Sequence, residues 1–231
     1  MELSPFYTKQ IECLHCKEKF EITKIRSKFV KVDHQETDFQ PIYANPEVNP
    51  ILYNAFVCEH CGFAFTEDFT KYFAPGVKDE IKEKISSKWI PRSLGGERNR
   101  TEAITAYKLA ILSGTLKHEK HVTLAGLSMR TAWIYRLEED TEQELRFVTL
   151  ARNSYEESYS NEDYAGTQMS EVRVLYMIAE LSRRIGDREK ATRFFSRVIE
   201  KQKSTVEPKL IEMAKDRWQE MREEKEKGIV S

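Results

Sequence analysis

Cys13-Leu14-His15-Cys16 and Cys58-Glu59-His60-Cys61 are the two segments that decide how the N-terminal part of this chain folds, and they hold all four of its cysteines. A two-residue spacer lets a tight turn aim both sulfurs of a pair at one point, and two facing pairs supply the four ligands of a closed tetrahedral zinc site. The 41 residues between the pairs exceed the roughly 15–20 of compact ribbons, but the ligand geometry is unaffected. The sequence therefore predicts a structural Zn²⁺ held by Cys13, Cys16, Cys58 and Cys61.

Disulfides, a redox-active pair and plain buried thiols are the alternatives to a metal site. The N-terminus lacks the basic flank and apolar stretch of a signal peptide, and thiols stay reduced in the cytosol. A thioredoxin-type redox protein would need one such motif rather than two. We expect His15 and His60 to lie at the surface with their rings turned away from the metal.

The segment between the cysteine pairs contains two candidate strands. Residues 19–32 alternate and are rich in β-branched and aromatic side chains, and residues 52–57 lead into the second pair, which predicts an antiparallel ribbon. If residues 19–32 form one strand, Lys24, Arg26 and Lys28 share a face. A basic stripe on a zinc ribbon is one way to contact a nucleic-acid backbone, although an ordinary solvated face is the simpler interpretation. Asp33, Glu36 and Asp38 follow beside His34 in a loop. A cation site or an acid/base pair is the alternative for them, but exposed loop carboxylates are usually solvated, which is what we expect here.

The remainder of the chain is predicted to be helical. Residues 77–89 have the pattern of one helix, residues 91–96 (Pro-Arg-Ser-Leu-Gly-Gly) suggest a linker with a hinge at Gly95-Gly96, and few helix breakers follow Arg98. The predicted fold class is α+β, mostly α. We divide the chain into a zinc-ribbon-like module (1–75), a helix and linker (76–97) and an α-helical domain (98–231).

One stretch of the helical part has the small and aromatic residues at the spacing of a helical repeat. Between residues 175 and 198 a helix is predicted to end at Gly186-Asp187 and a second to begin at once, with Ala191 and Phe195 at the contact between the two. This resembles a tetratricopeptide unit, but the spacing of weaker echoes departs from the ~34-residue period, so a plain bundle stays open. In the repeat register the inner face carries Arg173, Tyr176, Glu180 and Arg183, which would suit a peptide of acidic and aromatic character.

Several segments together resemble a known bacterial family, the domain of unknown function numbered 2225 (DUF2225). They are residues 33–43, the stretch from Asn49-Pro50 through Cys58 and Cys61 to Ala64, residues 125–136, and residues 180–187 with 194–196. The resemblance covers nearly the whole chain. It implies a zinc-ribbon-like N-terminus joined to tetratricopeptide-like helices in a cytoplasmic bacterial protein, and it implies no activity.

Composition and missing motifs limit the function classes. The chain has 231 residues, a hydrophobic fraction of 40% and 37 basic against 38 acidic residues, so it is no polycation built to coat nucleic acid or membrane. Its longest uncharged run, residues 48–58, is too short to span a bilayer. It contains no phosphate-binding loop, dinucleotide fingerprint or nucleophile elbow. We therefore predict a non-catalytic, cytoplasmic zinc protein that binds a protein or peptide, with no membrane association and no evident small-molecule substrate. The alternatives are a nucleic-acid-associated regulator and, third, a zinc or redox sensor.

Overall fold

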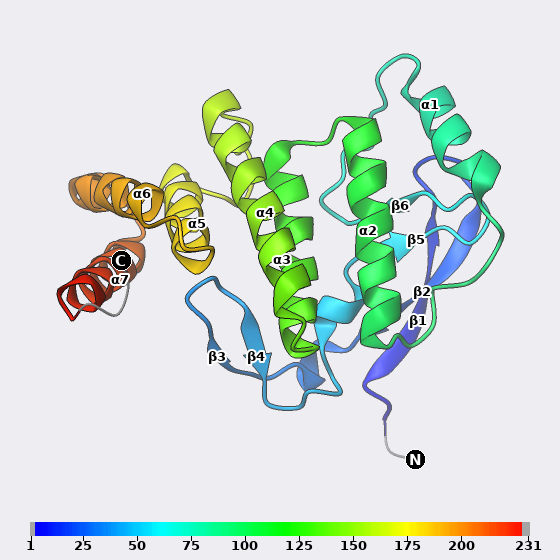
Figure 1. Cartoon of the computed structure of the whole chain (residues 1–231). Helices are drawn as coiled ribbons and strands as arrows, with labels where there is room; N and C mark the ends of the chain where they lie inside the picture. Colours follow the sequence, from blue (N-terminus) through cyan, green and yellow to red (C-terminus); the bar gives the residue numbers. More distant parts are fainter. Residues whose placement is uncertain (1–2, 228–231) are drawn as a thin grey trace.

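The computed structural model describes residues 3–227 and has three small antiparallel hairpins followed by a row of helices (Figure 1). The strands are β1 (Phe6–Glu12), β2 (Lys19–Ile25), β3 (Val32–Gln35), β4 (Pro41–Tyr43), β5 (Phe56–Val57) and β6 (Ala64–Phe65), paired β1–β2, β3–β4 and β5–β6. The α-helices are α1 (Val77–Lys84), α2 (Arg100–Lys117), α3 (His121–Leu137), α4 (Thr141–Asn161), α5 (Glu171–Arg184), α6 (Arg188–Glu200) and α7 (Pro208–Glu226). The predicted α+β, mostly α fold class is confirmed.

Three predicted elements are shorter than expected. The strand predicted over residues 19–32 ends at Ile25 and is followed by a 3-10 turn, Ser27–Phe29, before β3 begins. The strand predicted over residues 52–57 is reduced to β5, Phe56–Val57, because residues 52 and 53 belong to a 3-10 turn, Pro50–Tyr53, which is capped by the Asn49 side chain. The helix predicted over residues 77–89 ends at Lys84 and gives way to a 3-10 turn, Ser86–Lys88.

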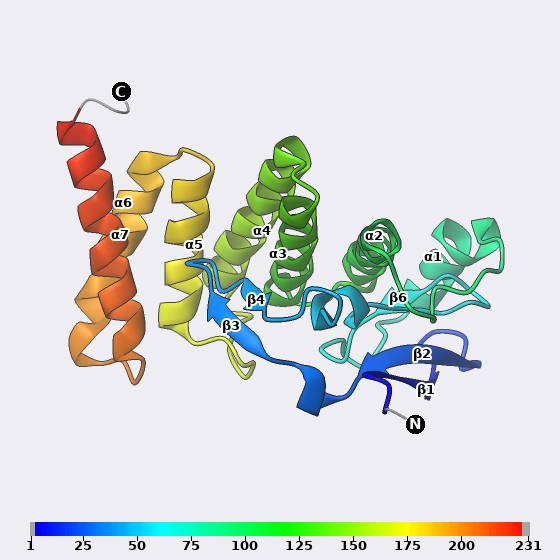
Figure 2. The same ribbon diagram turned by 90° about the horizontal axis from the view of Figure 1, so that it is seen from below.

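From α2 onward, consecutive helices pack side by side in sequence order, and the β3–β4 hairpin lies along one face of this row (Figure 2). Polar side chains define where several of these helices begin. Asn99 and Glu102 form a reciprocal capping box on α2, and Asp140, Ser170 and Asp187 accept hydrogen bonds from the first turns of α4, α5 and α6. Each cap satisfies a backbone N–H that has no partner within its helix.

The N-terminal hairpins and the helices share one continuous hydrophobic core. Ser113 of α2 accepts a hydrogen bond from Ala64 N, and Tyr107 of α2 donates to Ile51 O at 2.7 Å. The buried Arg98 donates to the carbonyls of Leu52, Ala55 and Leu94. The predicted domain boundaries therefore fall inside a packed region.

The hinge predicted at Gly95-Gly96 is wrong for Gly95. Its carbonyl accepts a hydrogen bond from Thr23 of β2 at 2.8 Å, and a Cβ at this position would lie 2.0 Å from the carbonyl oxygen of Glu21. Glycine is required here because the linker backbone packs directly against the strand. The linker is thus fixed to β2 at this point.

The helix pair predicted around Gly186-Asp187 is confirmed. Helix α5 ends at Arg184, Gly186 has a φ of 83°, and Asp187 caps α6. Ala191 and Phe195 are both 0% exposed, and the Phe195 ring meets Tyr176 of α5 edge-on with 6.0 Å between the ring centroids. The small residue allows the two helices to approach, and the aromatic ring fills the space between them.

Truncation of Phe195 tests this contact. We expect Phe195→Ala to lower the free energy of unfolding by roughly 3–5 kcal/mol, because a fully buried aromatic ring is replaced by a cavity. Chemical denaturation followed by circular dichroism measures the loss. Leu145→Ala on α4 is the control, since Leu145 is 40% exposed and its truncation should change stability little. Equal effects of the two changes would contradict the packing described.

Candidate metal centre and helical groove

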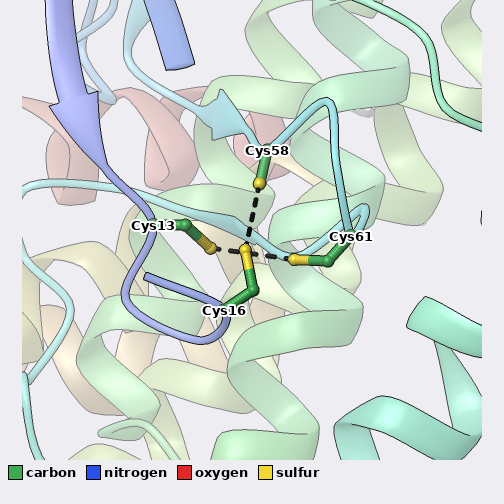
Figure 3. Close-up of side chains that lie close together, drawn as sticks. All are labelled: Cys13, Cys16, Cys58 and Cys61. Carbon is green, nitrogen blue, oxygen red and sulfur yellow. Dashed lines mark hydrogen bonds between the residues drawn. The ribbon is translucent and has the colours of Figure 1, made fainter. Parts of the chain in front are cut away.

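The four cysteines converge at one point between two hairpins. Cys13 and Cys16 lie in the turn that joins β1 to β2, Cys58 and Cys61 lie in the turn that joins β5 to β6, and their sulfurs point toward one another (Figure 3). The four sulfurs lie within 4.8 Å of one another; the Cys13–Cys61 separation is 3.7 Å and the Cys16–Cys58 separation is 3.6 Å. A tetrahedron with metal–sulfur bonds of about 2.3 Å has edges of about 3.8 Å, so the cluster has the size that one metal ion requires.

Backbone geometry explains why each pair forms such a turn. Lys17 N donates to Cys13 O and Gly62 N donates to Cys58 O, so both turns close in the same way. The residue after each pair has a positive φ, 69° at Lys17 and 72° at Gly62. At Gly62 a Cβ would also lie 2.6 Å from the Trp89 ring, whose Nε1 donates to Glu59 O at 2.7 Å. Trp89 therefore covers the second turn, a role that its position in the sequence does not reveal.

Hydrogen bonding among the sulfurs shifts their acidities in opposite directions. The pKa of Cys58 is lowered to about 2, because the neighbouring thiols of Cys13 and Cys61 and the backbone N–H groups of Cys61 and His60 stabilise its thiolate. The pKa of Cys13 is raised by its hydrogen bonds to Cys58 and Cys61 and by burial. The sulfurs thus lie close enough that the proton on one alters the acidity of its neighbours. A metal cation at the centre would replace those protons, so its binding releases protons and weakens as pH falls.

The two histidines between the cysteines are oriented away from the sulfur cluster. His60 is exposed, and its Nε2 lies 3.2 Å from Lys19 O. His15 is half-buried: its Nε2 lies 3.1 Å from Lys78 O and its ring packs against Phe63, with 5.7 Å between centroids. Each ring thus contributes to packing around the turns. Among residues 3–227, the only group of cysteine, histidine or acidic residues placed to hold a metal is the four cysteines, all unbridged.

The basic stripe predicted on β2 does not form. Lys24 shares its face of the strand with Phe20 and Ile22, which are buried, so this face turns inward. Its ammonium lies 2.8 Å from Glu67 and 4.8 Å from the centre of the Phe56 ring. Arg26 and Lys28 lie beyond the end of the strand, against Tyr7 and Phe29 respectively. The alternation that places hydrophobic residues in the core thus turns Lys24 toward the protein and leaves it half-buried.

The inner face predicted for the helical part is not open either. Tyr176 and Glu180 are 0% exposed, because the tip of the β3–β4 hairpin covers them. Tyr176 donates its hydroxyl to Thr37 O at 2.8 Å, and the Thr37 hydroxyl donates to the Glu180 carboxylate. Arg183 is paired with Glu180, and Arg173 binds Glu207 of the turn before α7. We call this region, formed by α3 and α5 and filled by residues 36–40, the helical groove.

Asp38 is the centre of the contact between the hairpin tip and the helical groove. Its carboxylate is fully buried and accepts from Arg136 at 2.7 Å and Trp133 Nε1 at 3.2 Å, with Arg184 at 3.5 Å. Burial opposes ionisation, but the hydrogen bond from Arg136 and the charges of Arg184 and Arg136 outweigh it and keep the pKa of Asp38 below its ordinary value. The prediction that this residue is solvated is therefore wrong.

Phe39 occupies the helical groove beside Asp38. Its ring lies 5.5 Å from the Tyr176 ring, centroid to centroid, and the Arg173 guanidinium lies 5.3 Å from its centre. Its φ of 66° is unusual for a residue with a side chain, and the turn between Glu36 and Gln40 requires it. The aromatic side chain thus contacts two of the predicted inner-face positions, Arg173 and Tyr176. The acidic side chain, Asp38, instead binds Arg136 and Arg184, which were not among the predicted positions.

The fold and the four-cysteine cluster define the class of protein: a mostly helical α+β chain with an N-terminal tetrathiol site able to hold one metal ion. Residues 6–221 match the family described as "Uncharacterized protein conserved in bacteria (DUF2225)", and the chain belongs to this family. The family resemblance found in the sequence is confirmed. No curated protein and no solved structure gives a significant match. Within residues 3–227, no helix combines the length and the apolar character that crossing a membrane demands.

Metal analysis tests the four-cysteine cluster. Protein purified without added metal should contain about one metal ion per chain, and Cys58→Ser should abolish this content. Because the second turn packs directly on α2, we expect removal of the ion by a chelator to lower the free energy of unfolding by on the order of 5 kcal/mol. His60→Gln, in the same turn, should retain the metal. Freely titrating thiols and no metal in the wild type would contradict the site.

Asp38→Asn tests the contact between the hairpin and the helical groove. We expect a loss of roughly 3 kcal/mol in stability, because two partly buried guanidinium groups lose their shared carboxylate. With a pKa below its ordinary value of 3.8 in the folded state, Asp38 contributes stability above that value and loses it as pH falls further. The stability difference between wild type and variant should therefore shrink below about pH 4. Asp33→Asn, exposed on the same hairpin, is the control, and an equal effect of both changes would refute the contact.

Proposed function

We propose that this protein is a non-catalytic, zinc-stabilised protein-interaction module. Four thiolates at tetrahedral spacing suit Zn²⁺, which has no geometric preference of its own and accepts sulfur ligands readily. A metal held by all four sulfurs keeps no position for water or substrate, so its role is structural. The unbridged cysteines fit a reducing compartment, which supports a cytoplasmic location.

The observation that carries the proposal is the chemistry of the helical groove. Arg136 and Arg184 bind a carboxylate, and Tyr176 and Arg173 contact an aromatic ring. These groups belong to α3 and α5, while the groups they bind belong to a hairpin about 100 or more residues away in sequence. We infer that the helical groove recognises an acidic–aromatic segment and that the hairpin tip occupies it in the absence of a partner.

The arrangement of the helices supports the same function. Helices α2 to α7 pack as successive neighbours, and the α5–α6 pair has the small and aromatic residues of a tetratricopeptide-like unit at its contact. Arrays of helical pairs form extended surfaces that bind segments of other proteins. The alternative, a nucleic-acid-associated regulator, depends on Lys24, Arg26 and Lys28 acting as one face, and these residues contact the protein's own side chains.

A peptide-binding experiment tests the proposal. In the full chain, Thr37, Asp38 and Phe39 are each replaced by glycine, which leaves the helical groove without its occupant. A fluorescent peptide of residues 33–43 should then bind this variant with micromolar affinity, and the wild type at least about 10-fold more weakly, because its own tip competes at high effective concentration. Fluorescence anisotropy measures both affinities.

The matched control is the same peptide with Asp38→Lys and Phe39→Ser. It should not bind, because the lysine repels Arg136 and Arg184 and the aromatic contact is lost. Circular dichroism and metal content establish that the variant is folded. If the folded glycine variant does not bind the peptide of residues 33–43 at a protein concentration of about 1 mM, the proposal is contradicted. Capture from a bacterial extract, with and without nuclease, then separates protein partners from nucleic acid.

A further inference from the structure

A second hollow lies outside the helical groove and the metal centre. It has a volume of about 520 Å³, opens to solvent on one side, and is lined by the first half of α3, by α4, by the loop before α5 and by residues that follow β6. Its walls include Lys120, Thr123, Gly126, Arg130, Tyr155 and Met169. This volume lies in the range of small-molecule sites, roughly 300–1,000 Å³.

Arg130 is the unusual residue of this cavity. Among residues 3–227, no carboxylate lies within 4.0 Å of its guanidinium, and its one hydrogen bond is from Nη1 to Gly126 O at 3.2 Å, one turn back in the same helix. The arginines of the helical groove, Arg136, Arg173, Arg183 and Arg184, are all paired with carboxylates. The remaining donors of Arg130 thus have no partner from the described part of the protein.

The two acidic residues that line the cavity do not neutralise this charge. The Glu119 carboxylate is buried and bound by Lys117 at 2.5 Å and by Thr70 N at 3.0 Å. Asp68 is exposed and forms none of the ion pairs found within residues 3–227. Lys120, which directly precedes α3, adds a second positive charge to the lining, and its ammonium donates to Ala165 O at 2.9 Å. With Glu119 neutralised by Lys117, the lining carries two cations, Lys120 and Arg130, against the one remaining carboxylate, that of Asp68.

Neighbouring side chains provide both a polar and an apolar surface. Burial raises the pKa of Tyr155 to about 12, and the charge of Arg130 counteracts part of this rise, so the two groups are within electrostatic reach. Val122 and Met169 line the same cavity and offer apolar contact. A guanidinium of this kind binds carboxylate and phosphate oxygens through paired, charge-assisted hydrogen bonds.

We propose that this cavity binds a small organic anion, a carboxylate or a phosphate monoester with an apolar body. Arg130 binds the anionic group, and Val122, Tyr155 and Met169 surround the apolar part. The site is independent of the zinc centre and of the occupant of the helical groove. It gives the protein a small-molecule ligand in addition to a protein partner.

Three probes of similar shape test the ligand chemistry on the full-length, metal-loaded chain: benzoate, phenyl phosphate and the neutral benzyl alcohol. Isothermal titration should show one saturable site for at least one of the two anions and none for the alcohol. Binding of benzoate alone identifies a carboxylate ligand, and binding of phenyl phosphate alone identifies a phosphate monoester. Failure of both anions at about 10 mM overturns the proposal, as does equal binding of the alcohol.

Three variants locate the site. Arg130→Gln should lower the affinity for the anion at least about 10-fold, because a charge-assisted hydrogen bond is lost. Gly126→Leu keeps the charge of Arg130 but fills the cavity, and it should also remove binding. Leucine favours the helical conformation more than glycine does. This variant therefore tests the site even if Arg130→Gln fails to fold. Arg193→Gln is the control, since Arg193 is exposed on α6, where its guanidinium lies 5.3 Å from the centre of the Phe194 ring. Binding that persists in folded Arg130→Gln or Gly126→Leu overturns the assignment.

Discussion

The short strands of the N-terminal part require support from outside themselves. Its hairpins have strands of two to seven residues, and two-stranded hairpins of this size are marginal in water. Two contacts hold them in place. The four sulfurs join the β1–β2 and β5–β6 turns, and the buried carboxylate of Asp38 joins the β3–β4 hairpin to α3 and α5. The first contact has the geometry that a bound cation would stabilise, and the second depends on arginine side chains; both add to the hydrophobic core that the hairpins share with the helices.

The features that the sequence predicts correctly are those encoded within a few residues. A two-residue spacer fixes the direction of two sulfurs, and Gly186-Asp187 marks the end of one helix and the cap of the next. The predicted ends of helices and strands are wrong where a 3-10 turn intervenes, as at Ser27–Phe29. The charges along β2 predict a solvent-facing basic stripe, whereas Phe20 and Ile22 decide the orientation of the strand by entering the core.

The contacts that the sequence does not predict join residues far apart. Asp38 and Arg136 are 98 positions apart, and neither residue is marked by its neighbours as the partner of the other. Trp89 over Gly62 is a similar case, because nothing near the tryptophan indicates that its ring replaces a side chain at the cysteine turn. Inner-face positions of α5 could be found from helical periodicity, but periodicity gives no information on whether a surface is covered. In a protein whose overall charge is balanced, clustered arginines such as Arg136 and Arg184 indicate that an acidic side chain of the same chain is buried against them.

The distance between Asp38 and its partners also determines the order in which the molecule can assemble during synthesis. The ribosome completes residues 1–97 before any of helices α2 to α7 exists, and the hairpin tip reaches its final position only after Arg184, 147 residues beyond Thr37, has left the exit tunnel. Closing a loop of this length carries an entropic cost that local contacts must first offset. Until then Asp38 and Phe39 remain in solvent, and the cysteine turns are the part of the nascent chain that can fold first.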